Sequence, residues 1–184
     1  MTELASSGQL RAAFLRWALV CVPAVVLLGF VSMAISGGGA DSAWFEGLVK
    51  PGLFPPPATF GIVWTALYMM MGLALAMIIT AWGAAGRGLA FSVFAVQLVM
   101  NLAWSPLFFG AHQISWALGL LVALDVAVLV TLVLFARVRR RAAMLMLPYL
   151  LWILFATLLN WQFLEQNRDA DGVVEPDAMV RIQM

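Results

Sequence analysis

Charge is scarce in this chain. Only 10% of its 184 residues are Asp, Glu, Lys or Arg, whereas 64% are hydrophobic and the mean hydropathy is +0.99. A soluble domain usually carries roughly 25% charged residues. This shortage excludes an ordinary soluble enzyme and a disordered chain. The net charge of +1, with no basic stripe, also argues against nucleic acid as a partner. The composition is that of an integral membrane protein.

Cysteine and histidine are rarer still. Cys21 is the only cysteine, so no internal disulfide can form. His112 is the only histidine, and no Cys, His or carboxylate lies near it at metal-ligand spacing. There is also no glycine-rich phosphate loop. The sequence therefore indicates no catalytic residue and no metal site.

Five long apolar stretches lie between the clusters of charge, at about 17–36, 58–82, 89–109, 113–136 and 142–164. Each is close to the roughly 20 residues that a helix needs to cross a bilayer. Each is apolar on all sides, unlike the alternating strands of a barrel. We predict an all-α integral membrane protein, a bundle of five transmembrane helices over 17–164, after an N-terminal segment 1–16 and before a flexible C-terminal tail 165–184.

The first stretch also has features of a signal peptide, with basic residues before it and Ser32-Met33-Ala34 near its end. Its apolar run is longer than the usual 7–15 residues, which favours a retained helix.

Lys and Arg are unevenly divided between the two ends of such a bundle. Seven fall on the N-terminal side and three on the other: Arg11, Arg16, Arg87, Arg137, Arg139, Arg140 and Arg141 against Lys50, Arg168 and Arg181. Because short loops rich in Lys and Arg stay in the cytoplasm, this predicts a cytoplasmic N-terminus. A composition rich in Ala and Val suggests a bacterial cell membrane.

Only one connection is long, residues 37–57. It opens with three glycines, closes with Pro55-Pro56-Pro57, and holds Trp44 and Phe45 between them. Pro57 suits the first turn of the next helix. The aromatic residues have two interpretations that the sequence leaves open. They anchor the loop at the membrane interface, or the loop is a lid over a cavity.

Polar and aromatic residues recur at helical spacing inside three of the predicted spans. The stripes are Phe60, Trp64 and Tyr68; Gln97, Asn101, Trp104, Ser105 and Phe108; and Tyr149, Trp152, Ala156 and Asn160. Amides in hydrocarbon need partners, and they either join helices or fix a ligand in a cavity. Since the stripes lie at mid-depth or in the half of the membrane nearest the long loop, their convergence favours a cavity beneath it.

Asp125 is the only charged residue inside a span, and intramembrane acids are candidates for function. Gly119, Ala123 and Ala127 form a ladder of small residues on the same span, which permits close helix contact within or between subunits.

Four stretches of this sequence resemble the motifs of the TspO or translocator protein family, the tryptophan-rich sensory proteins also called peripheral-type benzodiazepine receptors. They are Trp44-Phe45-x-x-Leu48-x-Lys50-Pro51-x-x-x-Pro55-Pro56, Phe60-x-x-Val63-Trp64-Thr65-x-Leu67-Tyr68, Gln97-Leu98-x-x-Asn101-x-x-Trp104-Ser105-Pro106-x-Phe108-Phe109-Gly110 and Pro148-Tyr149-Leu150-x-Trp152-x-x-x-Ala156-Thr157-x-Leu159-Asn160. The resemblance covers roughly residues 15–165. Leu53 stands where the family usually has Trp, Phe45 where it often has Tyr, and Trp161 lies where its sterol pattern requires Tyr.

The resemblance implies a five-helix bundle, often a homodimer, with a pocket under the first loop for porphyrins, sterols and benzodiazepine-type ligands. The pocket residues that it implies are Trp44, Trp64, Gln97, Asn101, Trp104, Phe108, Trp152 and Ala156. We add Lys50 as a candidate contact for the propionates of a porphyrin.

Our functional hypothesis is a receptor- or transporter-like membrane protein that binds a tetrapyrrole, with protoporphyrin IX or haem as ligand and no obligatory cofactor. Two alternatives remain: an enzyme that degrades porphyrin in light, and a scaffold or regulator whose ligand changes its interactions.

Overall fold

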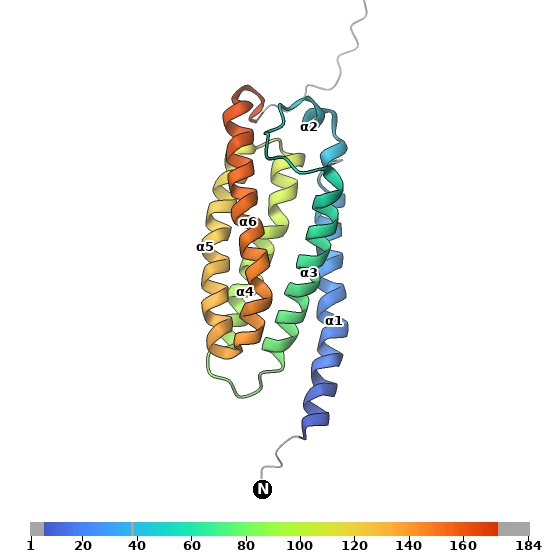
Figure 1. Ribbon diagram of the computed structural model, residues 1–184, viewed down its shortest axis with the longest axis vertical. Coiled ribbons are helices and arrows are strands. Elements are labelled where there is room, and N and C mark those ends of the chain that lie inside the picture. The colour runs from blue at the N-terminus through green and yellow to red at the C-terminus, as the bar shows by residue number, and fades with distance from the viewer. Residues whose placement is uncertain (1–5, 38, 173–184) are drawn as a thin grey trace, which may run out of the picture.

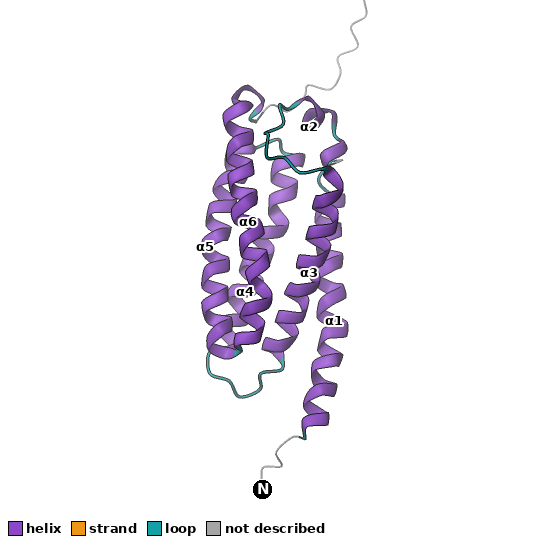
Figure 2. Cartoon of the chain, in the orientation of Figure 1, coloured by secondary structure: helices purple, strands orange, loops and turns teal. Residues whose placement is uncertain are grey.

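The computed structural model describes residues 6–37 and 39–172, and every regular element within them is helical (Figure 2). The five long helices are α1 Ser7–Ala34, α3 Pro57–Ile79, α4 Arg87–Ser105, α5 Ile114–Val138 and α6 Arg140–Gln166. All five are long and apolar enough to cross a membrane, which confirms the predicted fold class.

The first helix begins earlier than its apolar stretch. Ser6 and Gln9 form a capping box, in which the Gln9 amide donates to Ser6 Oγ at 3.3 Å and the Ser6 amide donates to Gln9 Oε1 at 2.8 Å. This pair satisfies backbone N–H groups that a helix start otherwise leaves free. Part of the predicted N-terminal segment is therefore helical, while residues 1–5 lie outside the described residues.

Pro106 interrupts the fourth helix. Proline has no N–H to donate to the preceding turn, and α4 ends at Ser105. A π-helical turn, Pro106–Gly110, follows, and the Ala111 amide donates to the Pro106 carbonyl at 2.9 Å. Such turns often occur at functional sites because they re-aim side chains. Here the turn carries Phe108 and Phe109, both buried.

The helices pack around the bundle in the order α1, α3, α6, α5, α4, and α4 also contacts α1 and α3 (Figure 1). The start of α1 lies at one end. The long loop, residues 37–56, crosses the other end and contains a short 3₁₀ turn, Gly39–Asp41, and the short helix α2, Ala43–Gly47. We call this loop the lid.

Two glycines bring α1 and α3 close together. A Cβ at Gly72 would lie 2.6 Å from Val22 Cα and 3.0 Å from the Cys21 carbonyl oxygen, so only glycine permits this approach of the two backbones. A Cβ at Gly29 would lie 2.1 Å from the Tyr68 ring. Gly29 thereby leaves space for an aromatic ring between the two helices.

Large apolar side chains cover the outside of the bundle. Leu19, Ile62 and Leu151 are strongly exposed, as expected for a surface in contact with lipid. Trp82 and Trp116 are exposed near helix ends, where the aromatic belt of a membrane protein lies.

The structure corrects the prediction of a flexible tail for its first eight residues. After α6 ends at Gln166, a 3₁₀ turn, Arg168–Ala170, folds back over the lid end of the bundle. The Gly172 amide donates to the His112 carbonyl at 2.8 Å, and the Ser115 amide donates to Asp171 Oδ1 at 3.0 Å. The low hydrophobicity of this segment predicted mobility. In the structure, however, the segment forms hydrogen bonds with the backbone of the loop after the π turn and of the start of α5. Residues 173–184 lie outside the described residues.

Candidate functional site

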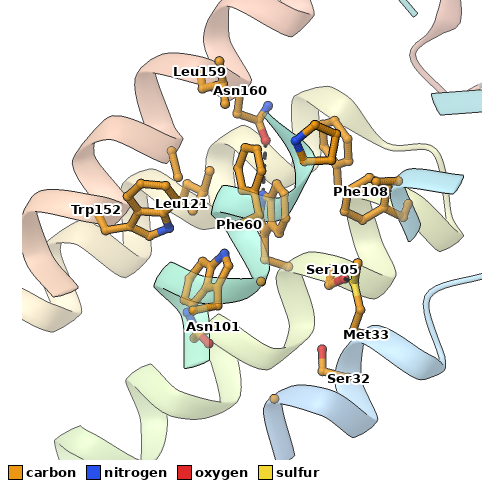
Figure 3. A pocket seen from close by; sticks show the side chains of 18 of the residues that line it. Ser32, Met33, Phe60, Asn101, Ser105, Phe108, Leu121, Trp152, Leu159 and Asn160 are labelled. Carbon is orange, nitrogen blue, oxygen red and sulfur yellow. Dashed lines mark hydrogen bonds between the residues drawn. The ribbon is translucent and has the colours of Figure 1, made fainter. Parts of the chain in front are cut away.

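A cavity of about 380 Å³ lies beneath the lid, within the range of pockets for small molecules (Figure 3). Side chains from α1, the lid, α3, α4, the π turn, α5 and α6 line it. Most of the lining is apolar, with aromatic rings contributed by Phe30, Phe45, Phe54, Phe60, Trp64, Tyr68, Trp104, Phe108, Phe109, Trp152 and Phe163. Such walls suit a flat, hydrophobic molecule, because ring faces stack on one another.

Six of the eight pocket residues implied by the sequence lie in this lining: Trp64, Asn101, Trp104, Phe108, Trp152 and Ala156. They come from α3, α4, the π turn and α6. The structure therefore brings the three polar and aromatic stripes to one cavity. Trp44 and Gln97 are not in the lining, and neither is Lys50.

Trp44 is a structural residue of the lid. Its ring stacks on His112 with 4.4 Å between ring centroids, and its edge meets Phe108 at 5.6 Å. Its indole Nε1 donates to the Ala170 carbonyl at 3.4 Å. Trp44 thus connects the lid to the loop after the π turn and to the C-terminal segment, behind the lining rather than in it.

Gln97 is fully buried between helices. Its Oε1 accepts a hydrogen bond of 3.0 Å from the Tyr149 hydroxyl, which joins α4 to α6. Its Nε2 has no hydrogen-bond partner among the residues that the structure describes. Of the two roles considered from the sequence, the structure assigns Gln97 to helix joining.

Asn101 and Asn160 both line the cavity and join helices. Asn101 Oδ1 accepts from the Tyr68 hydroxyl at 3.0 Å, across α4 and α3. Asn160 Oδ1 accepts from Trp104 Nε1 at 3.2 Å, while its Nδ2 donates to the Ile114 carbonyl at 3.0 Å. Asn160 therefore holds the Trp104 ring in place and ties α6 to α4 and α5 (Figure 3).

One indole N–H group of the lining is buried without a partner in the described part of the chain. Trp152 Nε1 is buried without a hydrogen bond. Trp64, beside it in the lining, makes ring contacts with Tyr68 at 5.3 Å and Tyr149 at 6.4 Å. A buried donor without a partner costs free energy, so the indole N–H of Trp152 is available to an acceptor of a ligand.

Lys50 is bound to the lid itself. Its ammonium donates to the carbonyls of Phe45, Glu46 and Leu48, at the end of α2, and lies 4.2 Å from the Phe45 ring centroid. Partial burial lowers the pKa of this ammonium, and the nearby Glu46 acts in the opposite direction. Since its donors serve these backbone carbonyls, the structure does not place Lys50 where it would contact a propionate in the cavity.

The C-terminal segment fastens the lid. Asn167 Oδ1 accepts from the Val49 amide at 2.7 Å, and Asn167 Nδ2 donates to the Val49 carbonyl at 3.0 Å. Asn167 also donates to the Phe163 carbonyl, which fixes the side chain at the end of α6. We call this two-way bond between Asn167 and Val49 the clasp. Of the two interpretations of the loop, its position over the cavity favours a lid.

Several lining residues were not predicted from the sequence to belong to the pocket. Gly29, Ser32 and Met33 bring α1 into the cavity wall. Ser32 Oγ donates to the Leu102 carbonyl at 2.6 Å, and this cross-helix bond is visible only in three dimensions. Phe163 was detectable, because it continues the stripe of Trp152, Ala156 and Asn160 by one more turn.

Asp125 lies outside the cavity lining. It is buried, and its Oδ2 accepts from Thr157 Oγ1 at 2.9 Å, between α5 and α6, while Oδ1 has no partner within residues 6–37 and 39–172. In the described residues it has no basic partner. No group of three metal-ligating side chains occurs among residues 6–37 and 39–172 either. The arrangement in the described residues is that of a membrane protein with five long helices and an aromatic cavity beneath a lid.

Comparison with known proteins identifies the family. A model of the TspO/MBR family matches residues 19–165. The chain is 37% identical over 149 residues to the tryptophan-rich protein TspO of Chlorobaculum tepidum, covering 80% of this chain and 94% of that protein. It is 35% identical over 164 residues to the translocator protein of Sus scrofa, covering 84% and 97%. It is also 36% identical over 124 residues to the tryptophan-rich sensory protein of Cereibacter sphaeroides, covering 67% and 77%.

The chain therefore belongs to the TspO/MBR family. It is an integral membrane protein, and membership of a family named for sensory and translocator proteins supports a receptor-like role in the membrane.

Proposed function

We propose that this protein binds a porphyrin in the cavity beneath the lid, as a membrane receptor or transporter for tetrapyrroles and related hydrophobic molecules. One observation carries the proposal. The aromatic side chains of Trp64, Trp104, Phe108 and Trp152 line one mostly apolar cavity. Aromatic stacking and the exclusion of water would together retain a macrocycle.

Titration of protoporphyrin IX into the purified protein, followed by tryptophan fluorescence, tests this function. We expect saturable quenching in the wild type and about tenfold weaker binding in a Trp64→Ala, Trp152→Ala double variant, because a stacked aromatic pair contributes about 0.5–1.5 kcal/mol. Trp116→Ala is the matched control, since Trp116 is 71% exposed and lies outside the cavity. Equal binding by the double variant and the control would refute the proposal.

Light-dependent degradation of the porphyrin is a different function of the same cavity. Analysis of the ligand after incubation in light and in the dark separates the two. Unchanged porphyrin in both samples supports binding alone, and a product that forms only in light supports the enzyme. A scaffold or regulator would instead recruit a protein only in the presence of the ligand, which a pull-down with and without porphyrin detects.

We further propose that the N-terminus lies in the cytoplasm of a bacterial cell, so that the lid faces the opposite side. The arginines of the connection between α5 and α6 support this orientation, because they lie at the end of the bundle away from the lid. A reporter fused before Ser7 that is active only in the cytoplasm tests it.

The family resemblance leads us to propose a homodimer as well. Gly119 and Ala123 are exposed on α5, so the ladder of small residues is free to contact a second subunit. The mass of the protein in detergent, measured by light scattering, tests this proposal.

A further inference from the structure

Asp125 lies near the middle of α5, and its carboxyl group is buried against α6, the neighbouring helix (Figure 1). Only 9% of the residue is exposed. Its Oδ2 lies 2.9 Å from Thr157 Oγ1, and no group of the described chain donates to its Oδ1. A buried carboxylate needs several hydrogen bonds or a cation, because a bare charge in an apolar setting is very costly. Thr157 alone does not meet that need.

The residues around Asp125 offer no charge that offsets a carboxylate. The elements packed against α5 are α4, the π turn and α6. The charged residues of α5 and of these elements, in the described chain, lie at helix ends: Arg87, Arg137, Arg140, Arg141 and Glu165. The nearest along α5 itself is Arg137, roughly 18 Å away at 1.5 Å per residue. Tyr149, inside α6, donates to Gln97. Tyr68 of α3 donates to Asn101.

Thr157 has two possible acceptors but only one proton. Its Oγ1 lies 2.9 Å from the Ile153 carbonyl oxygen as well as 2.9 Å from Asp125 Oδ2. A hydroxyl donates one hydrogen bond, and donation to the carbonyl four residues earlier is common for Thr in helices. The carbonyl oxygen can only accept. Both contacts are therefore satisfied together when Thr157 donates to Ile153 and accepts from a protonated Asp125. An ionised Asp125 would compete with Ile153 for the same proton.

We propose that Asp125 is a proton-binding site, whose carboxyl group is protonated at neutral pH and donates to Thr157. The proton removes the negative charge and supplies the donor that joins α5 to α6. This bond lies directly behind the cavity wall, because the adjacent residues Leu124 and Ala156 line the cavity. Loss of the proton would leave a charge there and break the bond between the two helices. The proposal does not depend on what the cavity binds.

Infrared difference spectra test the site directly, because a protonated carboxyl group has a carbonyl-stretching band that a carboxylate lacks. The wild type, Asp125→Asn and Glu46→Gln are compared in detergent at about pH 7, where exposed carboxyl groups are ionised. Glu46 is the matched control, since it is an exposed acid of the lid. We expect Asp125→Asn to lose the band of one carboxyl group and Glu46→Gln to retain it. Equal spectra of the wild type and Asp125→Asn overturn the proposal.

The pH dependence of stability is a second measurement. Unfolding in denaturant exposes Asp125 to water, where an aspartate loses its proton above about pH 4. Between about pH 5 and pH 7 folding then takes up one proton, so the wild type is more stable at the lower pH. Relative to Asp125→Asn, its unfolding equilibrium constant should rise about tenfold per pH unit. Glu46→Gln should follow the wild type. Parallel profiles of the wild type and Asp125→Asn overturn the proposal.

Thr157→Val keeps the test decisive if Asp125→Asn does not fold. It removes the acceptor of the proposed proton, so the carboxyl band should shift in frequency, and an unshifted band overturns the assigned bond. A bound monovalent cation is the alternative occupant of this position. It would leave Asp125 ionised, the wild type would lack the band, and exchange of sodium and potassium chloride for choline chloride would lower the thermal midpoint. That result overturns the proposal.

Discussion

Single amide side chains join helices of this bundle by hydrogen bonds. Asn160 binds both the Trp104 indole and the Ile114 carbonyl, so one residue links three helices. Hydrogen bonds inside membrane proteins contribute modestly on average. Their loss leaves polar groups unpaired in an apolar setting, however, and this costs more than the bond itself contributes.

At this scale we predict that Asn160→Leu lowers the free energy of unfolding by about 1–3 kcal/mol, because the Trp104 N–H and the Ile114 carbonyl both lose a partner. Thermal unfolding in detergent measures the change. Leu151→Ala is the control, since Leu151 faces outward from the same helix. Equal midpoints for the two variants would show that Asn160 has no role in joining the helices.

Whole elements meet at two kinds of contact, close packing of helices and fastening of the lid. Gly72 allows the backbones of α1 and α3 to approach, and the clasp of Asn167 and Val49 closes the lid onto the end of α6. The first contact supports the bundle. The second holds the lid against the end of α6.

Gly72→Ala should destabilise the protein by about 1–3 kcal/mol, because the added Cβ overlaps the backbone of α1 and forces the helices apart. Gly88→Ala on α4 provides the comparison, since nothing lies within 4 Å of a Cβ at that position. The thermal midpoints of both variants in detergent measure the effect. A loss of stability as large in Gly88→Ala as in Gly72→Ala would contradict the close contact of α1 and α3.

Asn167→Ala should speed dissociation of a bound porphyrin by about tenfold, because the two hydrogen bonds of the clasp together contribute about 1–3 kcal/mol to the closed lid. Stopped-flow displacement measures the dissociation rate. Arg168→Ala is the matched control, because Arg168 is the next residue and its side chain bonds only to Glu165. An unchanged dissociation rate in Asn167→Ala would mean that the lid opens independently of the C-terminal segment.

For the molecule as a whole, the cavity and the fold are coupled. The lining draws on α1 and α3 to α6 together with the lid, so a ligand that fills the cavity binds only the folded protein. A ligand with this property stabilises the native state by mass action.

Porphyrin at 100 times its dissociation constant should therefore raise the free energy of unfolding by about 2.7 kcal/mol, and removal of the ligand should reverse the effect. Thermal unfolding with and without porphyrin measures it. At the same porphyrin concentration, the Trp64→Ala, Trp152→Ala double variant, which we expect to bind about tenfold more weakly, should keep only about 1.4 kcal/mol of this stabilisation, whereas Trp116→Ala should keep all of it. Stabilisation of the double variant equal to that of the wild type would place the ligand elsewhere.

The amino-acid sequence by itself determined the five spans. Helices are the solution for long apolar segments in a bilayer, and this follows from composition and length alone. Helical spacing also grouped the polar and aromatic residues on shared faces, because residues three and four apart share a face. Their positions along the spans placed Trp64, Asn101 and Trp104 in the half of the membrane nearest the lid, and Trp152 near mid-depth.

Tertiary structure decided what each of these residues contacts. Trp44 and Gln97 are next to the cavity without lining it, Lys50 binds its own loop, and Asn167 fastens the lid. None of these facts follows from spacing along one helix. Hydrogen-bond partners such as Asn167 and Val49 are 118 positions apart in the chain, and only the packing of the helices brings them together.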